Sequence, residues 1–142
     1  MRILLFLSAC LFLAGAGFSQ KNTATDSVPT YLRTAVIPDF TTYKAPDSTV
    51  FTKEDMQKGT PALLMIFSPD CGHCQNVTTE IIKNIDHFKK TQIVMVTWLP
   101  FSDMTSFYTT YKIAEYPQII MAWDPKYFFL TYYHVQMYPK LI

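Results

Sequence analysis

The sequence predicts an α/β fold in which the strands pair in parallel. Two largely apolar runs, at 62–67 and 93–99, have the length and composition of strands that are buried on both faces. Apolar residues at helical spacing follow each run, over 74–88 and 103–111. Strands that alternate with helices are typical of parallel pairing, so we expect a central sheet with helices packed against it.

The other segments extend this alternation. Short strands are expected at 36–40 and 50–52, with a turn at 44–48 that contains Pro46 and Asp47. The helix over 74–88 ends on two lysines, where positive charge suits the helix dipole. A further extended segment is expected at 118–123 and a turn at Asp124–Pro125, while 128–133 fits a helix or a strand equally. The apolar face of the first helix consists of Val77, Ile81, Ile82, Ile85 and Phe88.

Residues 1–19 have the pattern of a secretory signal peptide. Arg2 gives a positive start, residues 3–18 carry no charge, and Gly17 and Ser19 are small residues before a cut at Gln20. The stretch is short for a membrane span of about 20 residues, so cleavage is favoured over an uncleaved membrane anchor. A lipobox-like Leu-Ser-Ala-Cys ends at Cys10, before the apolar run is complete, which disfavours lipidation. We expect a flexible lead-in at 20–35 and one domain at 36–142.

Composition excludes one class of function and sets the compartment. The 12 basic and 11 acidic residues form no basic stripe, so a nucleic-acid binder is not expected. An exported chain would reside in the periplasm or on the extracytoplasmic face of the membrane, where thiols can be oxidised. It would meet the membrane itself only if the N-terminal segment is uncleaved or lipidated.

Signal removal leaves two cysteines in the chain, Cys71 and Cys74, separated by Gly72 and His73. A helix that starts after Cys71 would present unpaired N–H groups and the positive end of its dipole to that sulfur. Both stabilise a thiolate, the species that attacks disulfides. A protonated His73 would add positive charge, and Gly72 would keep the turn permissive so that the two sulfurs can bond.

Two other interpretations of the cysteine pair are disfavoured. A zinc site needs more ligands, and no second pair of cysteines exists, while the three histidines lack ligand spacing. A purely structural disulfide would close a very small loop and gain little loop entropy. We therefore expect no metal and no cofactor other than the redox-active Cys71–Cys74 pair.

The segment Phe-Ser-Pro-Asp-Cys-Gly-His-Cys at 67–74, after a buried strand, resembles the active site of thioredoxin-fold proteins. The segments at 37–40 and 58–61 resemble the lead-in of TlpA/ResA-like exported thiol–disulfide oxidoreductases. The likeness covers about 36–142. It implies a thioredoxin-like α/β fold, with a central mixed sheet flanked by helices, an N-terminal strand pair and a strand–helix insertion.

The resemblance also implies a cis-proline loop that faces the cysteines, for which two similar segments qualify. One ends at Tyr116–Pro117 and the other at Tyr138–Pro139. The spacing to Pro117 is similar to plain thioredoxins, and that to Pro139 is similar to TlpA/ResA-like proteins. We favour Pro139, with Tyr138 beside it as a binding residue and Pro117 as the alternative. The final strand pair and C-terminal helix of the fold would then lie beyond Ile142, so we expect a C-terminally incomplete domain.

The sequence departs from the family at the positions that handle protons. Met65 stands where thioredoxins have a buried Asp, and Val77 and Thr79 replace the Glu and Pro often seen after the motif. Asp70 and Glu80 are the nearby carboxylates, and Glu80 is expected on a polar helix face. Trp98 and Trp123 are expected in the core or at its rim.

These observations predict an exported thiol–disulfide oxidoreductase with Cys71 as nucleophile and Cys74 as resolving thiol. Its expected partners are exported proteins with disulfides or thiols, and an upstream thiol protein that donates or accepts electrons. The alternatives are a non-catalytic binding or assembly protein of the same fold and a peroxiredoxin-type antioxidant protein. Against the latter, no Thr-x-x-Cys peroxidatic motif is present.

Overall fold

The structure, a computed structural model, describes residues 28–34 and 36–142. The expected signal peptide and most of the expected lead-in lie outside the described residues. Within them, no helix combines the length and apolar character that a membrane crossing requires. The elements, with η for a 3-10 helix, are α1 (Thr30–Arg33), β1 (Thr41–Lys44), β2 (Val50–Thr52), η2 (Lys53–Asp55), β3 (Ala62–Ile66), α2 (Gly72–Lys83), η3 (Ile85–Phe88), β4 (Gln92–Thr97), α3 (Phe101–Thr110), η4 (Ile113–Glu115), β5 (Ile119–Trp123), α4 (Phe128–Tyr132) and β6 (Lys140–Leu141).

The strands form one mixed sheet of six strands in the order β2-β1-β5-β4-β3-β6. β4 pairs in parallel with both β3 and β5, while β1 and β6 pair antiparallel with their neighbours. The two apolar runs of the sequence are therefore the two central strands. The predicted α/β class with a mixed sheet between helices is confirmed.

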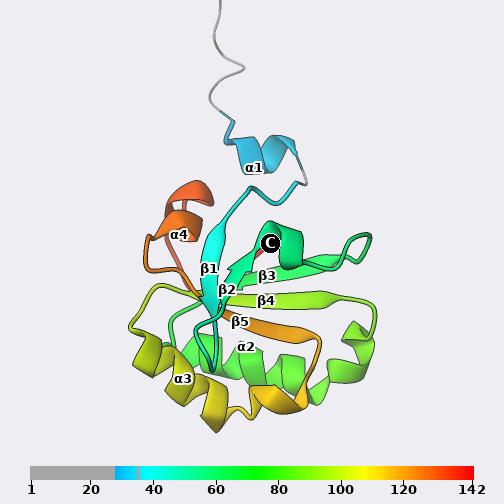
Figure 1. Cartoon of the computed structure of the whole chain (residues 1–142), viewed down its shortest axis with the longest axis vertical. Coiled ribbons are helices and arrows are strands. Elements are labelled where there is room, and N and C mark those ends of the chain that lie inside the picture. The colour runs from blue at the N-terminus through cyan, green and yellow to red at the C-terminus, as the bar shows by residue number, and fades with distance from the viewer. Residues whose placement is uncertain (1–27, 35) are drawn as a thin grey trace, which may run out of the picture.

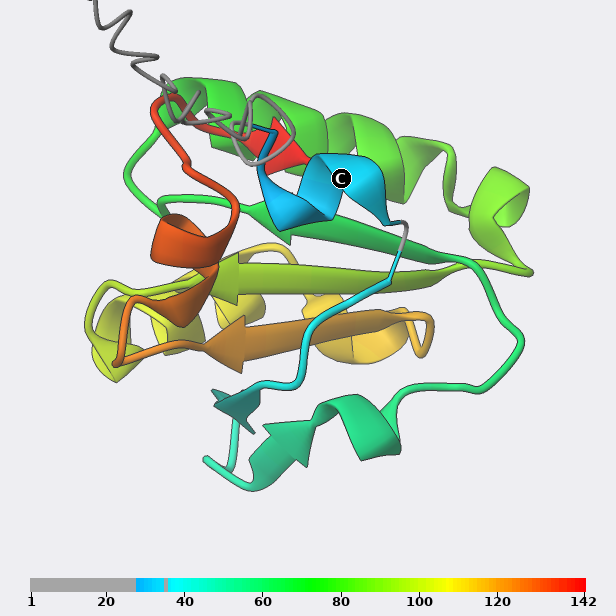
Figure 2. The same ribbon diagram turned by 90° about the horizontal axis from the view of Figure 1, so that it is seen from above.

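Helices cover both faces of the sheet, with α2 and α3 on one face and α1 and α4 on the other (Figure 1). Alternate residues of the buried strands supply the two cores. Met95 packs toward α2 and α3, whereas Val94 and Val96 pack toward α4. The view from above shows α1 and β6 lying over the β3 side of the sheet (Figure 2). β4 is buried along its whole length, as its composition predicts.

The structure corrects two expected elements, the strand at 36–40 and the helix over 74–88. Residues 36–40 are not a strand, and β1 starts at Thr41. Pro38 has no N–H with which to join the hydrogen-bond ladder of a sheet. Phe40 is nevertheless buried in the core. The helix expected over 74–88 begins at Gly72 and ends at Lys83, because the Asn84 amide bonds back to the Glu80 carbonyl and a 3-10 turn follows.

The segment 128–133, which fitted helix or strand, is helical over 128–132. The carboxylate of Asp124 accepts a hydrogen bond from the N–H of Phe129 at 2.8 Å and so satisfies a donor in the first turn of α4. Phe129 is buried against the rings of Phe40 and Tyr133, which holds α4 on the sheet.

Truncating this anchor tests the packing of α4. Phe129→Ala should lower the free energy of unfolding by about 3–5 kcal/mol, because it removes a fully buried ring and leaves a cavity. Urea unfolding followed by far-UV circular dichroism measures the change. Thr131→Ala, on the exposed side of the same helix, is the control and should cost less than about 0.5 kcal/mol. Equal effects of the two changes would contradict this account of α4.

Candidate functional site

The two cysteines lie at the point where the chain leaves β3 and enters α2. Cys71 is the N-cap of α2, with an extended backbone, and Cys74 lies in the first turn. The sulfur of Cys71 accepts a hydrogen bond from the N–H of Cys74 at 3.4 Å. Cys71 thus takes the capping role that Ser, Thr or Asp usually fill, and its sulfur satisfies one of the unpaired donors of the helix start.

The two sulfurs differ in their access to solvent. Cys71 is half-buried, whereas Cys74 is 0% exposed and packs in the core between the sheet, α2 and α3. Both are free thiols. The outer thiol can therefore meet another molecule, and the inner thiol can reach only its neighbour.

The pKa values of the two thiols move in opposite directions. The pKa of Cys71 lies below its ordinary value, chiefly because the Cys74 thiol donates to its sulfur and then because the Cys74 N–H does the same. The N–H of His73 acts in the same direction, while partial burial opposes it. Burial and donation to Cys71 raise the pKa of Cys74 to about 12. The outer sulfur is therefore the one that ionises first.

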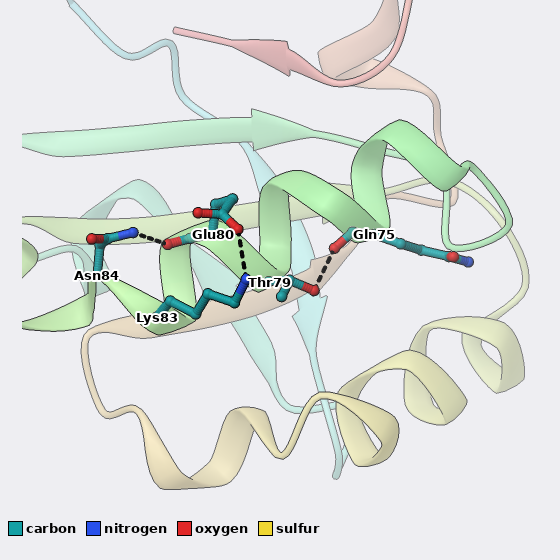
Figure 3. A network of polar contacts seen from close by, with 5 residues as sticks. All are labelled: Gln75, Thr79, Glu80, Lys83 and Asn84. Carbon is teal, nitrogen blue, oxygen red and sulfur yellow. Dashed lines mark hydrogen bonds and ion pairs between the residues drawn. The ribbon is translucent and has the colours of Figure 1, made fainter.

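Asp70 is the carboxylate that acts on both sulfurs. It accepts a hydrogen bond from the Ser68 hydroxyl, and its negative charge raises the pKa of Cys71 and of Cys74. Glu80 bonds instead to Lys83 at 2.9 Å on the exposed face of α2, in the polar network of Figure 3. Glu80 thus lies on a polar helix face, as the sequence predicted. Met65 is fully buried in the core that contains Cys74, so no carboxylate occupies that position.

His73 is exposed in the first turn of α2, and its backbone N–H acts on Cys71. A contribution from its imidazole stays a prediction. Among the residues that the structure describes, no three His, Cys, Asp or Glu side chains converge in a way that could hold a metal ion.

The expectation that Gly72 keeps the turn permissive so that the two sulfurs can bond stays a prediction, because both cysteines are free thiols in this structure. Gly72 is the first residue of α2 and has no positive φ, so its backbone is open to any residue. A Cβ added there would meet no atom within 4 Å. The position leaves open space next to Cys71 and is not a conformational requirement.

The loop before β6 reaches the cysteines. The Tyr138–Pro139 peptide is cis, and the Cys71 thiol lies 3.9 Å from the Tyr138 carbonyl oxygen, to which it donates. Pro117 precedes β5 and therefore lies at the opposite end of the parallel strands from Cys71, which follows β3. A second cis peptide, Ala45–Pro46, was not expected and lies in the turn between β1 and β2.

One aromatic neighbour of the site was not assigned to it from the sequence. The ring of Trp98 packs on that of Tyr138 with centroids 4.6 Å apart. Trp98 directly follows β4, so it shares the sheet edge at which Cys71 lies. That position after a buried parallel strand is the signal that could have identified it.

The chain belongs to the thioredoxin family, because the family model described as Thioredoxin matches residues 42–132. The Medicago sativa protein named "Probable protein disulfide-isomerase A6" is 31% identical over 91 residues, which make up 61% of this chain and 24% of that protein. The chain thus spans about a quarter of the length of the curated relative that it matches.

Solved structures share the fold at low sequence identity. A secreted disulfide oxidoreductase of Mycobacterium tuberculosis has a TM-score of 0.60 at 19% identity, with 72% of each chain covered. The thioredoxin domain of a thiol–disulfide oxidoreductase from Bacteroides vulgatus has a TM-score of 0.61 at 20% identity, covering 75% of this chain and 76% of that chain. Both comparisons support a thioredoxin-like fold.

The hydrogen bond between the thiols can be tested by removing its donor. In Cys74→Ala the pKa of Cys71 should be higher than in Cys74→Ser, where a hydroxyl can still donate. The pH dependence of iodoacetamide alkylation, followed by mass spectrometry, reports the thiolate. The alkylation curve of Cys74→Ala should therefore lie at higher pH than that of Cys74→Ser. Coincident curves would show that the Cys74 thiol does not lower the pKa of Cys71.

A second substitution tests the role of Gly72. Gly72→Ala should leave the fold intact and raise the free energy of unfolding by up to about 1 kcal/mol, since alanine favours a helix and has room there. Thermal unfolding measures the change. Gly59→Ala is the control: Gly59 has a φ of +73°, so alanine should destabilise the protein there. A destabilised Gly72→Ala variant would show that glycine is required at this position.

Proposed function

We propose that this chain is an exported thiol–disulfide oxidoreductase of the TlpA/ResA-like kind, in which Cys71 is the nucleophile and Cys74 the resolving thiol. The observation that carries the proposal is the asymmetry of the pair. Cys71 is accessible and has a lowered pKa, whereas Cys74 is fully buried with a pKa raised to about 12.

The reaction proceeds in two exchanges. The Cys71 thiolate attacks one sulfur of a partner disulfide, which breaks that S–S bond, releases the other partner sulfur as a thiolate and forms a mixed disulfide. Cys74 then loses its proton and attacks the Cys71 sulfur. The Cys71–Cys74 disulfide forms, the second partner sulfur leaves as a thiolate, and two electrons have passed to the partner. The reverse sequence oxidises a partner dithiol.

Capping by Cys71 aids the second exchange. The Cys74 N–H and thiol already point at the Cys71 sulfur, so the attacking group is held at the atom that it attacks. Once Cys71 is in a mixed disulfide it carries no negative charge, and the charge repulsion that raises the pKa of Cys74 is gone. Ionisation of the inner thiol is therefore easier at the moment at which it is needed.

The loop of Tyr138 and Pro139 is proposed to position the partner chain, because it lies against Cys71 and leaves the neighbouring Met137 81% exposed. His73 is proposed to add positive charge near the outer sulfur when protonated. Export is supported by the secretory pattern of residues 1–19 and by the secreted relative of the same fold. An upstream thiol protein is proposed to restore the redox state of the pair.

Insulin reduction by dithiothreitol, followed by turbidity, tests this function. The wild-type protein should accelerate precipitation, Cys71→Ser should abolish the acceleration, and Cys74→Ser should accumulate a mixed disulfide that is visible on a non-reducing gel. Thr131→Ser, on the exposed side of α4, is the matched control and should behave as wild type. Acceleration that survives Cys71→Ser would overturn the proposal. It would favour a binding or assembly protein of the same fold in which another group reacts.

A further inference from the structure

A groove of about 420 Å³ lies directly beside the dithiol pair. One wall is the segment that carries the cysteines, with Pro69 and Asp70 on one side of Cys71 and Gln75 after Cys74. The Gln75 amide donates to the Pro69 carbonyl at 3.0 Å, which ties this wall to the first turn of α2. The opposite wall is formed by Leu99 and residues of α3.

The charges that line the groove are all negative. Asp70 stands on one wall and Asp103 on the other, and no lysine or arginine lines the space. Asp103 is the only charged residue of α3. Each carboxylate is exposed and accepts a bond from a serine hydroxyl, and among the described residues neither is in an ion pair with a basic side chain. The groove therefore offers two carboxylates that the described chain leaves unneutralised.

The rest of the lining combines the uncharged polar side chains of Gln75, Ser106 and Thr110 with apolar and aromatic residues. Phe107 is buried and its ring is stacked on Tyr111, with centroids 4.2 Å apart. An apolar surface with aromatic rings suits the methylene stem of a long basic side chain, whose charged end stays near water and the carboxylates.

We propose that this groove, the Asp70–Asp103 groove, binds a lysine or arginine side chain of the polypeptide whose disulfide Cys71 attacks. The inference rests on the proposed function and names the class of substrate for the same site. Asp70 directly precedes Cys71, so the basic residue lies within a few positions of the partner's cysteine.

Binding at the groove is coupled to the chemistry. The charge of Asp70 raises the pKa of both cysteines, so a cation held beside it offsets that effect. A basic partner therefore favours the thiolate as it docks, whereas an acidic partner adds to the opposing charge.

Matched peptide disulfides test this. Short peptides with one cysteine are joined by a disulfide to thionitrobenzoate and are given to the Cys74→Ser background, which cannot resolve a mixed disulfide. Attack of Cys71 on the peptide sulfur releases the coloured thionitrobenzoate anion and leaves a Cys71–peptide disulfide. Attack on the other sulfur releases the colourless peptide thiolate and leaves thionitrobenzoate on Cys71, and mass spectrometry distinguishes the two adducts. The set places Lys, Gln or Glu two residues before or after the cysteine. At low salt the better Lys peptide should react about threefold to tenfold faster than its Gln partner, and the Glu peptide slower.

Salt and variants identify the groove as the cause. The Lys advantage should shrink in about 0.5 M NaCl, because screening weakens exposed charges. It should also shrink in Asp70→Asn and in Asp103→Asn, and disappear in the double variant. Asp86→Asn changes an exposed aspartate in η3, beyond the far end of α2; it is the control of equal charge change and should keep the advantage.

The outcomes separate the two proposals. Equal rates for the Lys, Gln and Glu peptides, or a Lys advantage that persists in the double variant, would overturn the groove proposal while leaving the oxidoreductase intact. If none of the peptides forms a mixed disulfide with Cys71, the proposed function itself fails.

Discussion

The site depends on one contact, the donation from the first turn of α2 to the sulfur of Cys71. A helix that begins at Gly72 leaves N–H groups without partners, and a sulfur at the N-cap is the nearest acceptor. The same contact brings the buried Cys74 to the sulfur that it attacks in the proposed reaction. This geometry lowers the pKa of Cys71, and together with the larger effect of burial it raises the pKa of Cys74; in the proposed reaction it also aligns the second exchange.

The sheet brings three distant segments to this helix start. β3 and β4 run in parallel, so Cys71 and Trp98, which follow them, lie at the same edge. β6 returns antiparallel to β3, and the loop before it places the Tyr138 carbonyl on Cys71 and its ring on Trp98. The strand directions explain why Pro139 reaches the site and the similar Pro117 segment does not.

The sequence predicted what depends on local pattern and missed what depends on distant partners. The two buried strands, the apolar face of α2 and the position of Cys71 before a helix all follow from runs and spacings. The helical conformation of 128–132 does not follow from local pattern, because it depends on the Asp124 carboxylate that accepts a hydrogen bond from the Phe129 N–H. The segment 36–40 is apolar enough for a strand, yet Pro38 lacks a donor and pairing starts after it. The helix start was expected at Cys74 but lies two residues earlier, because Cys71 caps the helix and its apolar pattern begins only after the cap.

The site carries its negative charge outside the core. Met65 fills the core beside Cys74 with a fully buried apolar side chain, while Asp70 stands exposed next to Cys71 and still acts on both sulfurs. The electrostatic effect of a buried carboxylate is set mainly by the surrounding protein. The effect of an exposed carboxylate also changes with salt and with any charged group that binds beside it. Electrostatic control of the cysteines is therefore open to the solution around them, and in the proposed reaction the charge of the docking polypeptide becomes part of the reactivity of the pair.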